Sequence, residues 1–173
     1  VLFVGGDWGR KGLFVTLEAL RDPRLMARRW CLVVVGPGDP DAIDAGGLGD
    51  RLRVVGEVAD SAPYFAAADL FVLPSAYETF GLAAFEAAAS GLPVIATAVG
   101  EIPMLLAEQS GERAGALVHR DAWSVADALV AYLDDSALRS RAGAVARTRA
   151  EAWSWDASVD AVFAAYATMK PRS

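Results

Sequence analysis

Two basic residues follow a glycine-rich turn near the start of the chain, and together they suit the binding of a diphosphate. The segment reads Gly5-Gly6-Asp7-Trp8-Gly9-Arg10-Lys11-Gly12. Glycine lets the backbone come close to a ligand, and Arg10 and Lys11 can neutralise its negative charge. We expect both cations at the start of a helix, where the helix dipole disfavours them, so a bound anion would account for their position. The alternative is a solvated helix start with ordinary basic residues.

Two glutamates in the middle of the chain could bind hydroxyl groups. Glu78 is expected in a loop after an apolar strand, and Glu86 two turns into a helix that begins near Phe80. Glu86 lies among alanine, leucine and phenylalanine, which is an unusual setting for a solvated carboxylate. The vicinal hydroxyls of a sugar would supply donors to it. Alternatively, Glu78 supports the helix dipole and Glu86 reaches water.

Apolar runs that alternate with helical patterns must position these residues. Strands are predicted over 1–5, 30–36, 52–56, 69–74 and 93–97, with a weaker sixth over 114–118. Helices are predicted over 12–21, 61–68, 80–90, 123–133, 136–151 and 155–169. This alternation indicates an α/β fold with a doubly wound, Rossmann-like parallel sheet and C-terminal helices. We expect residues 1–173 to form a single domain.

The carboxyl ends of the strands are the expected place for a ligand in such a sheet. Both the 5–12 loop and the 75–82 segment follow strands, so their charged residues should meet at one edge. The 5–12 loop has neither the Lys-Ser/Thr pair of a Walker A loop nor the GxGxxG dinucleotide fingerprint. This argues against a nicotinamide-dependent oxidoreductase, which is one function that the same fold can have.

Glu78 and Glu86, with seven residues between them around Phe80-Gly81-Leu82, resemble the EX7E signature of retaining, nucleotide-sugar-dependent glycosyltransferases of the GT4 type. Other segments follow in the family's order: Gly5 with Lys11-Gly12, Gly56 with Val58, 67–75, 91–97, and Trp153-Ser154-Trp155-Asp156. The resemblance covers almost the whole chain.

The resemblance implies one half of a GT-B fold, in which two Rossmann-like domains face a cleft. This chain would be the C-terminal, donor-binding domain of a member of glycosyl transferases group 1, transferring a hexose from a UDP-, GDP- or ADP-sugar to an acceptor left open. The chain begins without methionine, and we expect it to belong to a longer protein whose N-terminal acceptor domain is absent here. The isolated domain is not expected to turn over.

Carried over position by position, the resemblance also assigns roles. Lys11 would bind the donor diphosphate and stabilise the leaving group, with Arg10 as a second cation, and Glu78 would contact hydroxyls of the transferred sugar. The donor-binding positions would be Gly5, Gly6, Val58, Phe80, Gly81, Leu82 and Glu86. Among these, Glu86 would accept hydrogen bonds from the ribose, the backbone at Val58 would meet the base, and amides around Gly81 and Leu82 would hold phosphate.

Three positions depart from the family's pattern. Gly6 stands where many members have arginine, and the usual Gly-Gly-Ile-Pro-Glu loop reads Gly100-Glu101-Ile102-Pro103-Met104. These changes leave open a second reading, a non-catalytic nucleotide-binding or interaction module with the same fold.

The composition of the chain excludes several classes of binding partner. The 173 residues carry 16 basic and 22 acidic side chains, a net charge of −6, which argues against nucleic acid as a partner. One cysteine and one histidine argue against a Cys-rich or His-based metal site, and we expect no metal and no cofactor beyond the sugar nucleotide. No transmembrane segment is predicted. We expect a cytoplasmic protein, which the N-terminal domain could bring to the inner face of a membrane.

Overall fold

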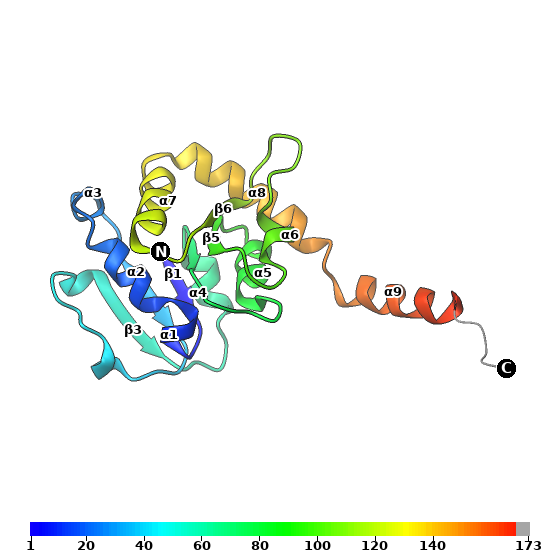
Figure 1. Ribbon diagram of the computed structural model, residues 1–173, viewed down its shortest axis with the longest axis horizontal. Helices are drawn as coiled ribbons and strands as arrows, with labels where there is room; N and C mark the ends of the chain where they lie inside the picture. The colour runs from blue at the N-terminus through cyan, green and yellow to red at the C-terminus, as the bar shows by residue number, and fades with distance from the viewer. Residues whose placement is uncertain (169–173) are drawn as a thin grey trace.

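The computed structural model describes residues 1–168 and contains a six-stranded parallel sheet (Figure 1). The strands are β1 (Leu2–Val4), β2 (Leu32–Val35), β3 (Leu52–Gly56), β4 (Phe71–Leu73), β5 (Val94–Thr97) and β6 (Gly115–Val118). Their order is β3-β2-β1-β4-β5-β6, and every neighbouring pair is parallel. This order reverses direction between β1 and β4, so the doubly wound, Rossmann-like fold is confirmed.

Nine α-helices connect and follow these strands within the described residues. They are α1 (Trp8–Lys11), α2 (Leu13–Leu20), α3 (Pro23–Met26), α4 (Ala62–Ala67), α5 (Leu82–Ala89), α6 (Ile102–Leu106), α7 (Ala122–Asp134), α8 (Ser136–Glu151) and α9 (Trp155–Thr168). Two short 3-10 helices, Pro40–Ala42 and Gly49–Arg51, lie between β2 and β3. The sequence did not predict α1, α3 and α6, because helices of four or five residues are too short to show a helical period.

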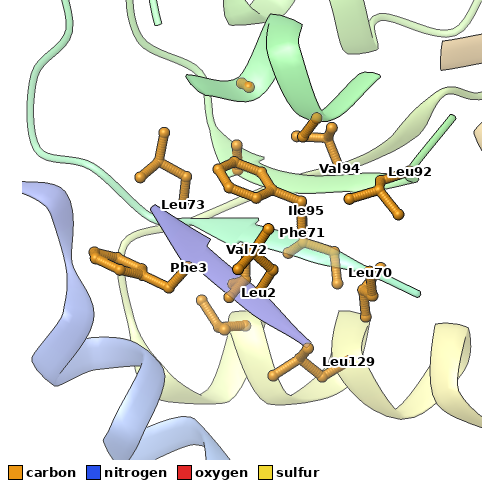
Figure 2. Packing of buried hydrophobic residues seen from close by; sticks show 14 of the residues in the cluster. Leu2, Phe3, Leu70, Phe71, Val72, Leu73, Leu92, Val94, Ile95 and Leu129 are labelled. Carbon is orange, nitrogen blue, oxygen red and sulfur yellow. The ribbon is translucent and has the colours of Figure 1, made fainter. Parts of the chain in front are cut away.

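The central strands are apolar runs because helices cover both faces of the sheet there, whereas the edge strands β3 and β6 have exposed residues. Phe3, Phe71 and Ile95 are completely buried in the central strands, and Leu129 of α7 packs beneath them (Figure 2). The α2 and α7 helices pack on each other, whereas α5 contacts β4 and β5 and packs on α8. These two layers hold the carboxyl ends of β1, β4 and β5 in fixed positions, and the candidate site lies there.

A small aromatic cluster ties the chain after α8 to the loop in front of α5. The Trp153 ring meets Phe80 edge-on at a centroid distance of 5.6 Å and Phe85 at 5.3 Å. The Phe80 and Phe85 rings are 4.5 Å apart. Beyond this cluster α9 leads away from the body of the domain with its described side chains exposed (Figure 1).

Removing the Trp153 ring should therefore cost stability. We expect Trp153→Ala to lower the free energy of unfolding by about 2 kcal/mol, since a half-exposed indole loses two aromatic contacts. Denaturant unfolding measures the change. Trp123→Ala is the control, because that ring is 71% exposed and should change stability by less than about 0.5 kcal/mol. An equal loss in both variants would contradict the structural role of the cluster.

Candidate functional site

A buried ion pair joins the loops that follow β1 and β4. Lys11 Nζ donates to Glu78 Oε1 at 3.0 Å, and the side chains of Lys11 and Glu78 are 16% and 8% exposed. The two residues are 67 positions apart in sequence, but β1 and β4 are neighbours in the sheet. The structure thus brings two of the residues expected to act in catalysis into direct contact.

Arg10 links the same two loops from the other side. Its Nη1 donates to the Tyr77 carbonyl at 2.7 Å and lies 3.6 Å from Glu78 Oε1, while its Nε donates to Asp7 Oδ2 at 3.0 Å. The backbone adds a further bond, from the Ala76 amide to the Arg10 carbonyl at 2.8 Å. The guanidinium is therefore already engaged by two carboxylates and a carbonyl.

Arg10 and Lys11 directly precede α2, as expected, but they also belong to a short helix that the sequence did not predict. Both lie in the last turn of α1, which begins after Asp7 and ends at Gly12. The single turn of α1 has little dipole of its own, and both cations lie at the amino end of the longer α2, so the helix dipoles do not decide whether an anion binds here. Gly12 ends α1 and is also the N-cap of α2.

Glycines in the first loop make room for neighbouring groups. A Cβ atom at Gly5 would lie 2.2 Å from Cδ of Lys11, so the lysine stem passes over Gly5. At Gly6 a Cβ would lie 2.9 Å from Cγ of Pro37, and at Gly12 it would lie 2.2 Å from the Pro74 carbonyl oxygen. Gly5 thus supports Lys11 directly, and Gly12 allows the loop after β1 to touch the end of β4.

The start of α5 lies beside this pair and offers free backbone donors. Gly81 is the N-cap in the left-handed region (φ 100°), and no side chain caps the helix. Within residues 1–168 the amides of Leu82 and Ala83 donate to no protein acceptor. Uncapped amides at a helix N-terminus are suited to a phosphate oxygen.

The loop after β5 packs tightly against Phe80 and Glu78. A Cβ at Gly100 would lie 2.7 Å from the Phe80 carbonyl oxygen and 3.0 Å from that of Glu78. The Glu101 amide donates to the Phe80 carbonyl at 2.9 Å. Glu101 is half-buried, whereas Met104 is 59% exposed. Glu101 and Met104, two of the positions that depart from the family's pattern, therefore come directly after the glycine that packs against the Glu78 backbone.

Glu86 and Val58 lie apart from the ion pair. Glu86 is on the exposed side of α5, and its carboxylate has no ion pair or hydrogen bond within the described residues. Partial desolvation raises the pKa of Glu86 above its ordinary value. Val58 follows β3 at the sheet edge, two strands from β1 or about 10 Å at ordinary strand spacing. The candidate residues thus spread along the carboxyl edge rather than forming one cluster.

Three residues that sequence reasoning did not single out complete the site. Asp7 holds Arg10, and Ser75 Oγ donates to Glu78 Oε1 at 2.8 Å. Thr97 Oγ1 donates to the Ser75 carbonyl at 2.6 Å. A serine directly after an apolar strand, three positions before a glutamate, is the signal that could have identified Ser75.

No three side chains of histidine, cysteine, aspartate or glutamate gather in an arrangement that could hold a metal ion in residues 1–168. In the same part of the chain, every helix is too short or too polar to span a bilayer.

The sheet order defines a Rossmann-like α/β protein, whose carboxyl edge carries cations, carboxylates and an uncapped helix start. The chain belongs to the family Glycosyl transferases group 1, whose model matches residues 1–135. Members of this family are glycosyltransferases, and the resemblance stated from the EX7E segment is thereby confirmed at the level of the family.

Individual relatives agree with this assignment. The chain is 33% identical to the phosphatidyl-myo-inositol mannosyltransferase of Mycobacterium leprae, over 98% of this chain and 46% of that protein. The sucrose-phosphate synthase of Thermosynechococcus elongatus superposes with a TM-score of 0.78 at 33% identity, covering 95% of this chain and 44% of that one. HepE of Anabaena, solved with UDP-glucose, has a TM-score of 0.78 at 22% identity, over 97% and 48% of the two chains, and shows the shared fold alone. The chain spans less than half the length of these three relatives.

Proposed function

We propose that this chain is the donor-binding domain of a retaining, GT4-type glycosyltransferase that uses a UDP-, GDP- or ADP-sugar. The observation that carries the proposal is the buried Lys11–Glu78 pair beside the uncapped start of α5, in a chain of a glycosyltransferase family. Lys11 and the free amides of α5 suit phosphate, and the Glu78 carboxylate suits sugar hydroxyls.

In the proposed complex Lys11 is the principal cation for the diphosphate. Its ammonium is only partly exposed and is held in place by Glu78, so it needs little reorganisation to meet a phosphate oxygen. Charge that develops on the departing diphosphate is stabilised by Lys11, by Arg10 and by the amides of Leu82 and Ala83. These groups do the neutralising that a divalent metal would otherwise do.

Glu78 would face the transferred sugar with its second oxygen. Oε1 already accepts from Lys11 and Ser75, which occupies its two lone pairs. Oε2 accepts no hydrogen bond within the described residues and is not sealed from solvent. A sugar hydroxyl donating to Oε2 would lie next to the phosphate held by Lys11, which places the reacting carbon between them.

The nucleoside would extend from this point along the carboxyl edge. Glu86 is proposed to accept the ribose hydroxyls, and the backbone at Val58 to meet the base. We further propose that catalysis needs an N-terminal acceptor domain, that α9 packs against it, and that the isolated chain binds donor without transferring sugar.

Glu86 provides a test of the nucleoside position. We expect Glu86→Gln to weaken nucleoside diphosphate binding by about tenfold, because ribose hydroxyls lose a charged acceptor. Stability should not fall. Since desolvation raises the pKa of Glu86, the ionised carboxylate costs stability in full above its folded pKa, and this cost shrinks as pH falls from the folded pKa to the unfolded pKa. Calorimetric titration measures the affinity, with the exposed Glu18→Gln of α2 as control. Equal affinities for both variants would remove Glu86 from the site.

The experiment that tests the proposal is a thermal-shift titration with UDP, GDP, ADP and NAD. A ligand at 100 times its dissociation constant adds about 2.7 kcal/mol of apparent stability, which shifts the midpoint visibly. We expect a shift with one nucleoside diphosphate that is nearly lost in Lys11→Ala and reduced to about half in Glu86→Ala, each compared with its own ligand-free midpoint. A shift with NAD alone would overturn the proposal.

A non-catalytic nucleotide-binding or interaction module is the second candidate. It is favoured by the engagement of Lys11 and Arg10 with Glu78 and Asp7, and by the acidic Glu101 beside Phe80. Nucleotide binding without sugar transfer, in protein that contains an acceptor domain, would support this candidate over the first.

A further inference from the structure

Two buried hydroxyl groups, those of Thr97 and Ser75, connect β5 to the Glu78 carboxylate through the backbone of Ser75. Within residues 1–168 four polar or charged side chains are buried: Thr16, Ser75, Glu78 and Thr97. Thr16 bonds its own helix, since Oγ1 donates to the Gly12 carbonyl at 3.1 Å. The other three are linked to one another, and two of them have no part in the function proposed above.

Ser75 is held rigidly at the end of β4. Its amide donates to the Leu73 carbonyl at 2.9 Å, and its carbonyl accepts from Thr97 Oγ1 at 2.6 Å. Leu73 pairs with Ala96 across β4 and β5, so Thr97 follows directly on that pair. Both backbone polar groups of Ser75 are thus hydrogen-bonded. The remaining freedom of this residue is the orientation of its hydroxyl group.

The Ser75 hydroxyl can only act as the donor in its hydrogen bond to Glu78. A carboxylate can only accept, so Ser75 Oγ must donate its proton to Glu78 Oε1, at 2.8 Å. Lys11 Nζ donates to the same oxygen at 3.0 Å. Two donors on Oε1 fix the rotation of the carboxylate, so that Oε2 is the oxygen left for a ligand.

We propose that Ser75 is a positioning residue that sets the orientation of Glu78, and that Thr97 in turn orients Ser75. This inference rests on the proposed function, since it assigns the free oxygen of Glu78 to a donor sugar. Without the Ser75 hydroxyl the carboxylate can rotate about its last torsion. It then holds Lys11 less firmly and presents either oxygen to the sugar.

The ammonium group of Lys11 reports directly on this arrangement. The sequence has only two lysines, Lys11 and Lys170, so a chain labelled with ¹⁵N-lysine gives two ammonium signals, which Lys11→Arg assigns. We expect the Lys11 ammonium protons of Ser75→Ala to exchange with water about tenfold faster than in the wild type, the factor that corresponds to a charged hydrogen bond. Thr97→Val should change exchange in the same direction by a smaller factor. Thr16→Val, which removes an equally buried hydroxyl with no contact to Glu78, should leave it unchanged.

Ligand affinity gives the second readout. UDP and UDP-glucose, GDP and GDP-mannose, and ADP and ADP-glucose are titrated as pairs by calorimetry. For the pair that binds the wild type, Ser75→Ala should lower the ratio of sugar-nucleotide to diphosphate affinity about tenfold, because only the sugar contacts Glu78 Oε2. A purely structural role would weaken both ligands together.

The two readouts distinguish a failure of the Ser75 positioning role from a failure of the proposed donor site. Unchanged Lys11 exchange in Ser75→Ala, or an unchanged affinity ratio, would overturn the positioning role. If no pair binds the wild type, the donor site itself is wrong, and the exchange of the Lys11 ammonium still decides whether Ser75 fixes Glu78.

Discussion

Replacing Lys11 with methionine is expected to lower the affinity for the nucleoside diphosphate by about 100-fold and the free energy of unfolding by about 3 kcal/mol. Methionine keeps an apolar stem over Gly5 and removes the charge. The affinity falls because the proposed phosphate ligand is lost. The stability falls because the Glu78 carboxylate, on a side chain 8% exposed, loses its closest cation and keeps only the more exposed Arg10 Nη1, 3.6 Å away. Calorimetry and denaturant unfolding measure the two quantities.

A double variant separates the two effects. In Lys11→Met with Glu78→Gln no uncompensated charge is buried, so most of the lost stability should return. The diphosphate affinity should remain low, because the cation is still absent. Recovery of affinity in the double variant would show that Lys11 acts only as the counterion of Glu78 and does not touch the ligand.

Gly12→Ala is expected to lower the free energy of unfolding by at least about 3 kcal/mol. The residue has φ 84°, in the left-handed region, which costs an alanine about 1–2 kcal/mol. The new Cβ would also lie 2.2 Å from the Pro74 carbonyl oxygen, so the loop after β1 must move away from β4. That movement pulls Lys11 from Glu78, and we expect donor binding to be lost with the stability. Urea unfolding and the thermal-shift titration measure both.

Gly9→Ala is the matched control three residues away. Gly9 lies inside α1, and an added Cβ would meet no atom within 4 Å. Alanine is favoured over glycine within a helix, so stability should stay the same or rise by up to about 1 kcal/mol. A comparable loss at both positions would mean that the loop tolerates no side chain anywhere, rather than that Gly12 makes a specific close approach.

Much of the fold was predictable from residue patterns, because the central strands β4 and β5 are buried on both faces. The segment predicted over 52–56 matches β3, and the helical pattern over 136–151 matches α8. The helix predicted to 169 is described to Thr168 as α9, and Met169 lies outside the described residues. The three short helices were not predicted, so the helical turn that contains Arg10 and Lys11 was missed, although their position directly before α2 was expected.

The candidate site was predictable as a set of loops and not as a set of contacts. Parallel strands end at one edge, which was enough to expect Lys11 and Glu78 close together. Their pairing through one carboxylate oxygen depends on β1 and β4 being neighbours and on Gly12 touching Pro74, which residue types alone do not reveal. Ser75 and Thr97 were missed for the same reason, since a buried serine or threonine has no charge or period to mark it.

The loops after β1 and β4 are joined by backbone as well as side chains, through the Ala76 amide on the Arg10 carbonyl and the Arg10 guanidinium on the Tyr77 carbonyl. They behave as one unit made of two distant pieces of sequence. An engineer who wished to transplant this site into a related scaffold would have to move both pieces together with Ser75. Exchanging either loop alone would remove one partner from each of these hydrogen bonds.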